Sequence, residues 1–279
     1  MTPDPPASDG PPPADGPPPA DGPPSSDGPT RVPLPVETRA PGGETNAYLV
    51  GSLLIDPAAE SPKIDPATVD HVAVTHTHPD HVGGVAHYAA EADATVWAHA
   101  DHAERFLSRT GVEPDRTFRD GDHVGPASVL ETPGHAPDHV CFAIGDKNAE
   151  SRSLLGGDLM VADGSVVVGA PEGDLRAYLE SLRTVRDAGF EAVYPGHGPT
   201  VTDPAATATR LIDHRLAREE AVLAAVENGA EAVDEVLDAA YEKDLSGVRD
   251  LARATVAAHL IKLADEGRIE GAWRERATE

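Results

Sequence analysis

The 279-residue sequence contains few cysteines, lysines and aromatic residues, and it lacks a long apolar run. Its single cysteine, Cys141, excludes an internal disulfide framework and lies in the apolar run VCFAI, so we predict a small core residue there. No run of about 18 apolar residues occurs, so we predict no membrane span and no membrane among the partners. The N-terminus lacks a basic segment followed by an apolar one, which favours a cytoplasmic protein over a secreted one.

The charge is strongly unbalanced. Acidic residues number 48 against 22 basic ones, for a formal net charge of -26. Only four of the basic residues are lysines, and aromatic residues make up 4% of the chain. Such a surface repels itself at low ionic strength, and salt screens that repulsion. We therefore predict a halophilic protein, adapted to high salt, with an ordinary acidic protein as the alternative.

Residues 1–30 differ from the rest of the chain. The motif DGPPPA occupies residues 9–14 and again 15–20, and no apolar residue larger than alanine or proline follows Met1 until Val32. A segment of this composition buries too little apolar surface to offset the entropy of ordering. We predict a disordered Pro/Gly/Asp-rich tail, followed by a folded chain that is long enough for one large domain and one small domain.

Residues 72–84 read VAVTHTHPDHVGG and crowd three histidines and one aspartate into six positions. His76 and His78 are two residues apart on an extended backbone, so their imidazoles project to one side and can bind one ion. Asp80 and His81 turn away from that pair and can bind a second ion. The pattern therefore predicts a dinuclear metal site, with a polar surface loop as the alternative.

Three later segments repeat the arrangement of an apolar strand, a glycine turn and a ligand-type side chain. They are TPGHAPDH, with His135 and His139, then LLGGD, with Asp158, and YPGH, with His197. Asn46 and Asp56 lie at the ends of two predicted strands near the start of the folded chain. A turn or capping role is the alternative for each, and for Asn46 it is equally typical.

These segments, in this order, resemble the metallo-β-lactamase superfamily and its HxHxDH signature. The resemblance covers Arg31 to Asp203 and implies an α+β fold, a four-layer αββα sandwich with a metal site at one edge of the sheets. Matching motif to motif implies that three residues bind a first metal: His76, His78 and His135. It implies that three others bind a second metal, with Asp158 bridging both: Asp80, His81 and His197. The same matching places three residues beside the site: His139, Asn46 and Asp56. For His139 a supporting role is favoured over a ligand role.

The C-terminal region, residues 206–279, has the apolar spacing of three helices, and then IEGAW alternates like a strand. It resembles a winged-helix domain and the C-terminal region of the β-lactamase-like 2 branch of the superfamily. We accordingly predict a metallo-β-lactamase domain over 31–205 and a winged-helix-like domain over 206–279. A nucleic-acid-binding version would use Arg249, Arg253 and Lys262, but acidic residues share their helix. A lid, a wall or a homodimer contact is therefore favoured.

The predicted function is hydrolysis by a dinuclear zinc site, with iron or manganese as alternative metals. Two cations lower the pKa of a shared water, so that hydroxide is available to attack, and Asp80 accepts a proton. A small acyl substrate is favoured, a thioester or lactone of the glyoxalase II kind. The alternatives are a single-strand-specific endoribonuclease or phosphodiesterase, a mononuclear iron sulfur dioxygenase, and a non-catalytic metal-binding protein.

Overall fold

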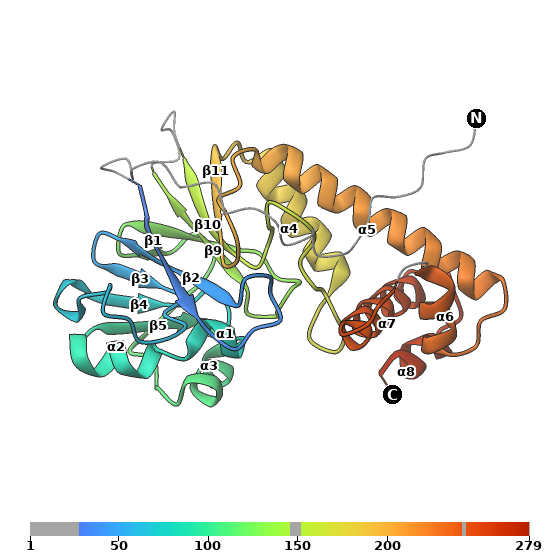
Figure 1. Ribbon diagram of the computed structural model, residues 1–279, viewed down its shortest axis with the longest axis horizontal. Helices are drawn as coiled ribbons and strands as arrows, with labels where there is room; N and C mark the ends of the chain where they lie inside the picture. The colour runs from blue at the N-terminus through green and yellow to red at the C-terminus, as the bar shows by residue number, and fades with distance from the viewer. Residues whose placement is uncertain (1–27, 146–151, 242–243, 279) are drawn as a thin grey trace.

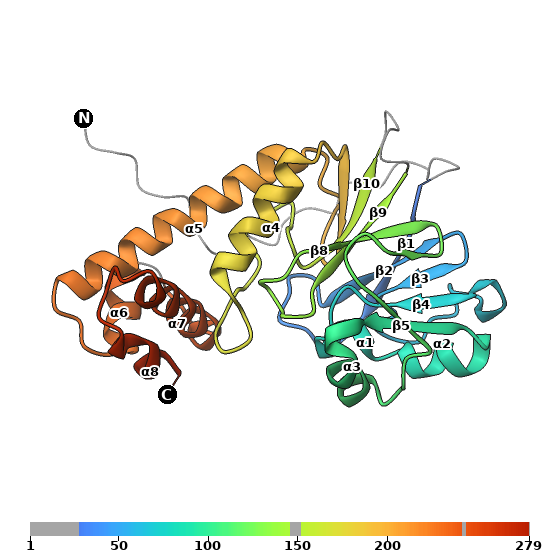
Figure 2. The same cartoon turned by 180° about the vertical axis from the view of Figure 1, so that it is seen from behind.

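The computed structural model describes residues 28–145, 152–241 and 244–278. The predicted tail, residues 1–30, lies outside the described residues except for its last three positions. Two β-sheets pack face to face, with helices on both outer sides (Figures 1 and 2). The predicted sandwich is confirmed at this level.

The first sheet has six strands that lie in sequence order. The neighbouring strands from β3 to β6 pair in parallel. Its strands are β1 (Thr30–Pro35), β2 (Glu44–Val50), β3 (Leu53–Ile55), β4 (His71–Ala73), β5 (Thr95–His99) and β6 (Arg116–Phe118). Three helices belong to this half: α1 (Pro79–Val82), α2 (Val85–Ala92) and α3 (Ala103–Thr110).

The second sheet has five strands, and β10 pairs parallel to β11 while the other pairs are antiparallel. Its strands, in spatial order, are β11 (Ala192–Pro195), β10 (Ser153–Gly157), β9 (Val140–Ile144), β8 (Ala127–Glu131) and β7 (His123–Val124). The helix α4 (Leu175–Asp187) and the first half of α5 (Pro204–Glu227) pack on its outer face.

The strands β3, β9 and β10 are buried on both faces over nearly their whole length, which explains their continuous apolar runs. In β3, Leu53 and Ile55 face the second sheet while Leu54 faces the helices of the first half. In β9, Phe142 faces the first sheet and Cys141 faces α4. The prediction that Cys141 is a buried core residue is confirmed.

The C-terminal region is helical. It contains α6 (Val233–Ala240), α7 (Arg249–Asp265) and α8 (Ala272–Thr278), which form a separate core with the second half of α5. The first half of α5 packs in the core of the second sheet, and its second half packs in this separate core. The domain boundary between residues 205 and 206 stays a prediction.

The predicted strand at IEGAW is wrong. Trp273 and Ala277 are four residues apart and lie buried on one face of α8, so helical packing buries the tryptophan. No strand is present among the described residues after Pro195, so a strand here would have no partner for its backbone groups. The hairpin of a winged helix is therefore absent from the described part of the C-terminal region.

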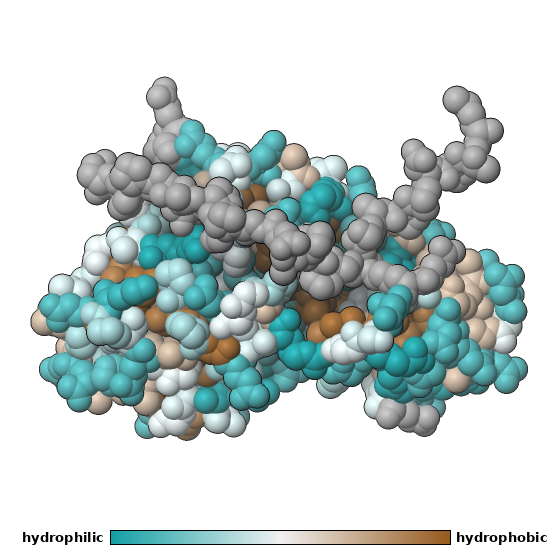
Figure 3. All heavy atoms as spheres, viewed as in Figure 1, coloured by the Kyte–Doolittle hydropathy of each residue, from teal (hydrophilic) through white to brown (hydrophobic). Residues whose placement is uncertain are grey.

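The surface view shows hydrophilic residues over much of the visible face, with smaller hydrophobic patches on the left part of the molecule and near its middle (Figure 3). Within the described residues, none of the helices combines the length and the apolar character needed to cross a membrane.

Candidate metal centre

The candidate ligands converge because they follow strands that end at the same edge of the sandwich. The segment from His76 to His81 follows β4, His135 follows β8, Asp158 follows β10 and His197 follows β11. Close packing leaves no room for a side chain behind them. A Cβ on Gly196 would lie 2.7 Å from both Asp158 Oδ1 and His81 Cε1, so glycine is required at that turn.

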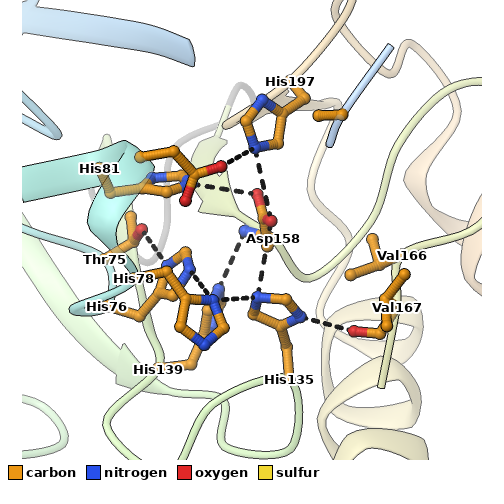
Figure 4. Close-up of polar contacts among 12 residues, drawn as sticks. Thr75, His76, His78, His81, His135, His139, Asp158, Val166, Val167 and His197 are labelled. Carbon is orange, nitrogen blue, oxygen red and sulfur yellow. Dashed lines mark hydrogen bonds and ion pairs between the residues drawn. The ribbon is translucent and has the colours of Figure 1, made fainter. Parts of the chain in front are cut away.

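Three imidazoles form the first cluster (Figure 4). His78 Nδ1 lies 3.0 Å from His76 Nε2 and 2.9 Å from His135 Nε2. On the far side of each ring, an acceptor fixes the proton. His135 Nδ1 donates to the carbonyl of Val167 at 2.7 Å, and His78 Nε2 donates to the carboxylate of Glu172 at 3.2 Å.

The proton of His76 is also fixed on the nitrogen that faces away from the cluster, in this case by Thr75. The Thr75 hydroxyl donates to Asp56 at 2.7 Å, so its oxygen accepts from His76 Nδ1 at 3.1 Å. The three facing nitrogens therefore carry lone pairs, which cannot hydrogen-bond one another. A shared cation resolves this arrangement, and neutral imidazole nitrogens are typical ligands of zinc.

The second cluster contains Asp80, His81 and His197. His81 Nδ1 donates to Asp56 at 3.0 Å, and His197 Nδ1 donates to the carbonyl of Glu44 at 2.8 Å. Both rings thus direct Nε2 inward, and His197 Nε2 lies 3.6 Å from Asp80 Oδ2. His81 Nε2 is buried and has no hydrogen-bond partner among the described residues. This donor set also fits a metal ion.

Asp158 lies between the two clusters. Its Oδ1 is 3.5 Å from His81 Nε2, and its Oδ2 is 3.5 Å from His135 Nε2 and 3.6 Å from His197 Nε2. Asp158 Oδ1 is buried and, within the described ranges, makes no hydrogen bond. Oδ1 thus faces the second cluster and Oδ2 lies between the two clusters, a placement that suits a bridging ligand.

Burial and the neighbouring charges favour neutral rings at His76 and His135 and a positive charge in the second cluster. Burial lowers the pKa of His76 well below its usual value and that of His135 to about 4. Burial would also lower the pKa of His81, but Asp56 and Asp158 outweigh it and raise that pKa to about 9. Burial would raise the pKa of Asp158, but His81, His197 and His135 hold it below its usual range. A field that stabilises a proton on His81 also stabilises a metal cation.

The three residues expected beside the site hydrogen-bond to candidate ligands or to the backbone next to them. His139 Nε2 accepts from the backbone N–H of Asp158 at 3.1 Å, so that nitrogen is occupied and His139 holds the Asp158 turn. Asn46 Nδ2 donates to the carbonyls of Pro195 and Gly198, which flank His197. Asp56 is 1% exposed and accepts from Thr75 and His81.

The structure adds supporting residues that the sequence analysis did not identify. Asp138 accepts from the backbone and the hydroxyl of Thr77, which joins the loop of His76 and His78 to the loop of His135. Arg105 donates to Thr77 at 2.8 Å and to both oxygens of Glu172. The Thr38 hydroxyl donates to Asp80 Oδ2 at 2.6 Å. Only the position of Asp138 next to His139 gave a signal in the sequence.

Comparison with known proteins agrees with this geometry. A model of the metallo-beta-lactamase superfamily matches residues 40–197. The chain is 34% identical over 215 residues to an atrochrysone carboxyl ACP thioesterase of Aspergillus chevalieri, which covers 67% of this chain and 63% of that protein. It is 28% identical to a beta-lactamase-like protein 2 homolog of Drosophila melanogaster over 254 residues, 81% of this chain and 84% of that protein.

Among solved structures, a metallo-beta-lactamase family protein of Thermus thermophilus is 25% identical, with a TM-score of 0.69. The match covers 86% of this chain and 94% of that one. The chain spans less than two thirds of the length of the Aspergillus relative.

Proposed function

Because the chain belongs to the metallo-β-lactamase superfamily, we propose that it is a dinuclear metal-dependent thioesterase. The observation that carries the proposal is the pair of clusters joined by Asp158, in which one nitrogen of each histidine is held by an oxygen acceptor and the other faces inward. His76, His78 and His135 would hold one ion. Asp80, His81 and His197 would hold the other, and zinc is the first candidate because of the histidine-rich donor set. Two such ions would supply Lewis acidity, lowering the pKa of a water and polarising the substrate carbonyl.

Asp80 is the residue we assign to proton transfer. Its carboxylate is partly exposed, and the Thr38 hydroxyl and His197 fix one of its oxygens. In the proposed reaction, the oxygen of a water forms a bond to the thioester carbon, and the carbon–sulfur bond breaks. Asp80 accepts a proton from the water and passes it to the departing thiolate, so the products are an acid and a thiol.

Two observations support an acyl substrate. Relatives that match about two thirds of the chain are named thioesterases, from Aspergillus chevalieri and Emericella nidulans. The basic residues that would bind phosphates in a nuclease have carboxylate partners. Arg249 pairs with Asp238 at 2.7 Å, and Lys262 pairs with Glu219 at 2.8 Å. A lactone substrate and a homodimer contact through the C-terminal helices stay predictions.

A side-by-side assay tests the proposal. Zinc-loaded protein is incubated in molar potassium chloride with an acyl-CoA thioester, S-lactoylglutathione, a lactone, a phosphodiester and single-stranded RNA. We expect the thioesters to be cleaved fastest, by a reaction that chelation and Asp80→Asn abolish. Asp101→Asn is the control, since that exposed carboxylate pairs with Arg119 away from the site.

Metal-dependent RNA cleavage that exceeds thioester turnover, and that Asp80→Asn abolishes, would replace the thioesterase with a nuclease. Oxidation of a persulfide with consumption of O₂ by the iron-loaded protein, together with no thioester cleavage by the zinc-loaded protein, would favour the dioxygenase.

A further inference from the structure

The 161–173 loop joins β10 to α4 and contacts two of the three histidines of the first cluster. The carbonyl of Val167 accepts from His135 Nδ1 at 2.7 Å, and Glu172 Oε2 accepts from His78 Nε2 at 3.2 Å. These contacts determine which nitrogen of each ring carries the proton. The ligand nitrogens therefore depend on a segment that itself contains no ligand.

The other side of the same loop is held by the C-terminal helices. Arg210 of α5 donates to the carbonyl of Gly164 at 2.7 Å, and Arg215 of α5 donates to the carbonyl of Val166. The backbone N–H of Ala170 donates to Ala254 of α7 at 3.0 Å. A Cβ on Gly169 would lie 2.8 Å from the Ala254 side chain, so the loop and α7 are in close contact.

Two arginines of α3 fix the carboxylate of Glu172. Arg105 donates to its two oxygens at 3.2 and 2.7 Å, and Arg109 donates to Oε1 at 3.1 Å. The side chain is 35% exposed, yet it has these partners on one side and His78 on the other. A carboxylate held in this way can orient an imidazole, whereas a freely rotating one cannot.

We propose that Glu172 is a positioning residue, which keeps the proton of His78 on Nε2 and so presents Nδ1 to the first metal ion. The C-terminal helices hold Glu172 in place through the 161–173 loop. The inference rests on the proposed function, because it requires a metal ion at the first cluster. The competing account is that Glu172 serves only as an ion-pair partner of Arg105 and Arg109.

Glu172→Ala and Glu172→Gln separate these accounts. Metal-free protein is titrated with Zn²⁺ against a chromophoric chelator, and the visible absorption of Co²⁺-substituted protein reports the ligand geometry. For Glu172→Ala we expect one of the two ions to bind about tenfold to a hundredfold more weakly and the Co²⁺ spectrum to change. Glutamine loses the charge that pairs with the arginines, but its amide oxygen still accepts from His78. We therefore expect it to recover most of the affinity.

Glu131→Ala is the matched control. Glu131 accepts from His99 Nε2 at 3.0 Å, a carboxylate–imidazole contact outside both clusters, so wild-type zinc affinity is expected. Wild-type affinity for both ions in Glu172→Ala, or a glutamine variant no better than alanine, would overturn the inference. If wild-type protein bound no zinc at all, the proposed function itself would fail. Should Glu172→Ala not fold, the glutamine variant alone decides, because weak binding with a changed Co²⁺ spectrum would contradict the proposed rescue.

Discussion

Replacing Asp56 with asparagine should weaken the second metal site while leaving the first intact. Asp56 accepts from the backbone of Thr75 at 2.6 Å, from the Thr75 hydroxyl at 2.7 Å and from His81 Nδ1 at 3.0 Å. Asparagine keeps one acceptor oxygen and replaces the other with an NH₂ group, which only donates. If the oxygen stays on the Thr75 backbone, the new NH₂ faces His81, whose Nδ1 must then accept. The ring proton moves to Nε2, the nitrogen that faces the second cluster. The NH₂ also faces the Thr75 hydroxyl, whose two lone pairs can accept from it and from His76 Nδ1, so the first cluster keeps its proton positions.

The expected magnitudes follow from these contacts. A hydrogen bond to a charged group contributes about 1.5–3 kcal/mol, and the variant keeps weaker, neutral versions of its contacts. We expect a loss of about 2 kcal/mol in the free energy of unfolding, less than the roughly 5–15 kcal/mol that a domain has. Binding a metal requires the His81 proton to return to Nδ1, opposite the NH₂ group. A penalty of about 1.4–2.7 kcal/mol corresponds to a Kd tenfold to a hundredfold weaker at one site.

Calorimetric titration of metal-free protein with Zn²⁺ measures both sites. We expect one wild-type Kd and one weakened Kd for Asp56→Asn, with thermal unfolding showing a folded protein. Asp115→Asn is the control, because Asp115 accepts from the Val96 backbone away from the clusters. Wild-type binding of both ions in Asp56→Asn would refute the tautomer argument. The argument would also fail if Asp56→Asn lost the same ion as His135→Ala and kept the other.

Three further predictions concern the metal content, the C-terminal core and the surface charge. His135→Ala removes one of three nitrogens of the first cluster. Elemental analysis should therefore find about one metal ion per chain instead of two, with turnover lost, and two retained ions would contradict the assignment. Glu219 is 2% exposed. Burial would raise its pKa, but His259 and Lys262 outweigh burial and lower that pKa to about 2. A lowered folded pKa stabilises the fold above the unfolded value near 4.3, and the contribution is lost as pH falls toward 2. At pH 7 the Glu219→Gln variant should therefore have a free energy of unfolding about 2 kcal/mol lower than the wild type, after allowance for partial screening by solvent. The difference should shrink below about pH 4, and Glu220→Gln, at an exposed neighbour, should show little effect. Because salt screens the repulsion caused by the net charge of -26, the melting temperature should be higher in molar than in millimolar potassium chloride. An equal melting temperature in both would reject the high-salt hypothesis.

The sequence by itself indicated the candidate ligands and the kind of element that carries them. His76 and His78 are neighbours in a local pattern, and each later ligand follows an apolar strand and a glycine turn, so chemistry and position could both be read without a structure. The superfamily resemblance followed from the same motifs and is confirmed. Burial of Cys141 was predictable for the same reason, since an unbroken apolar run is typical of a strand covered on both faces.

Tertiary structure alone decided how the ligands are oriented and how the chain ends. Glu172 and His78 are 94 residues apart, and Asp138 and Thr77 are 61 apart, so no local pattern links either pair. Whether a carboxylate lies against an imidazole depends on where the 161–173 loop is held by α5 and α7, which is a property of packing. The alternation in IEGAW was too short to distinguish a strand from a helix end. The outcome was α8, because the neighbouring helices could bury Trp273 and no described strand lay there to pair with the chain.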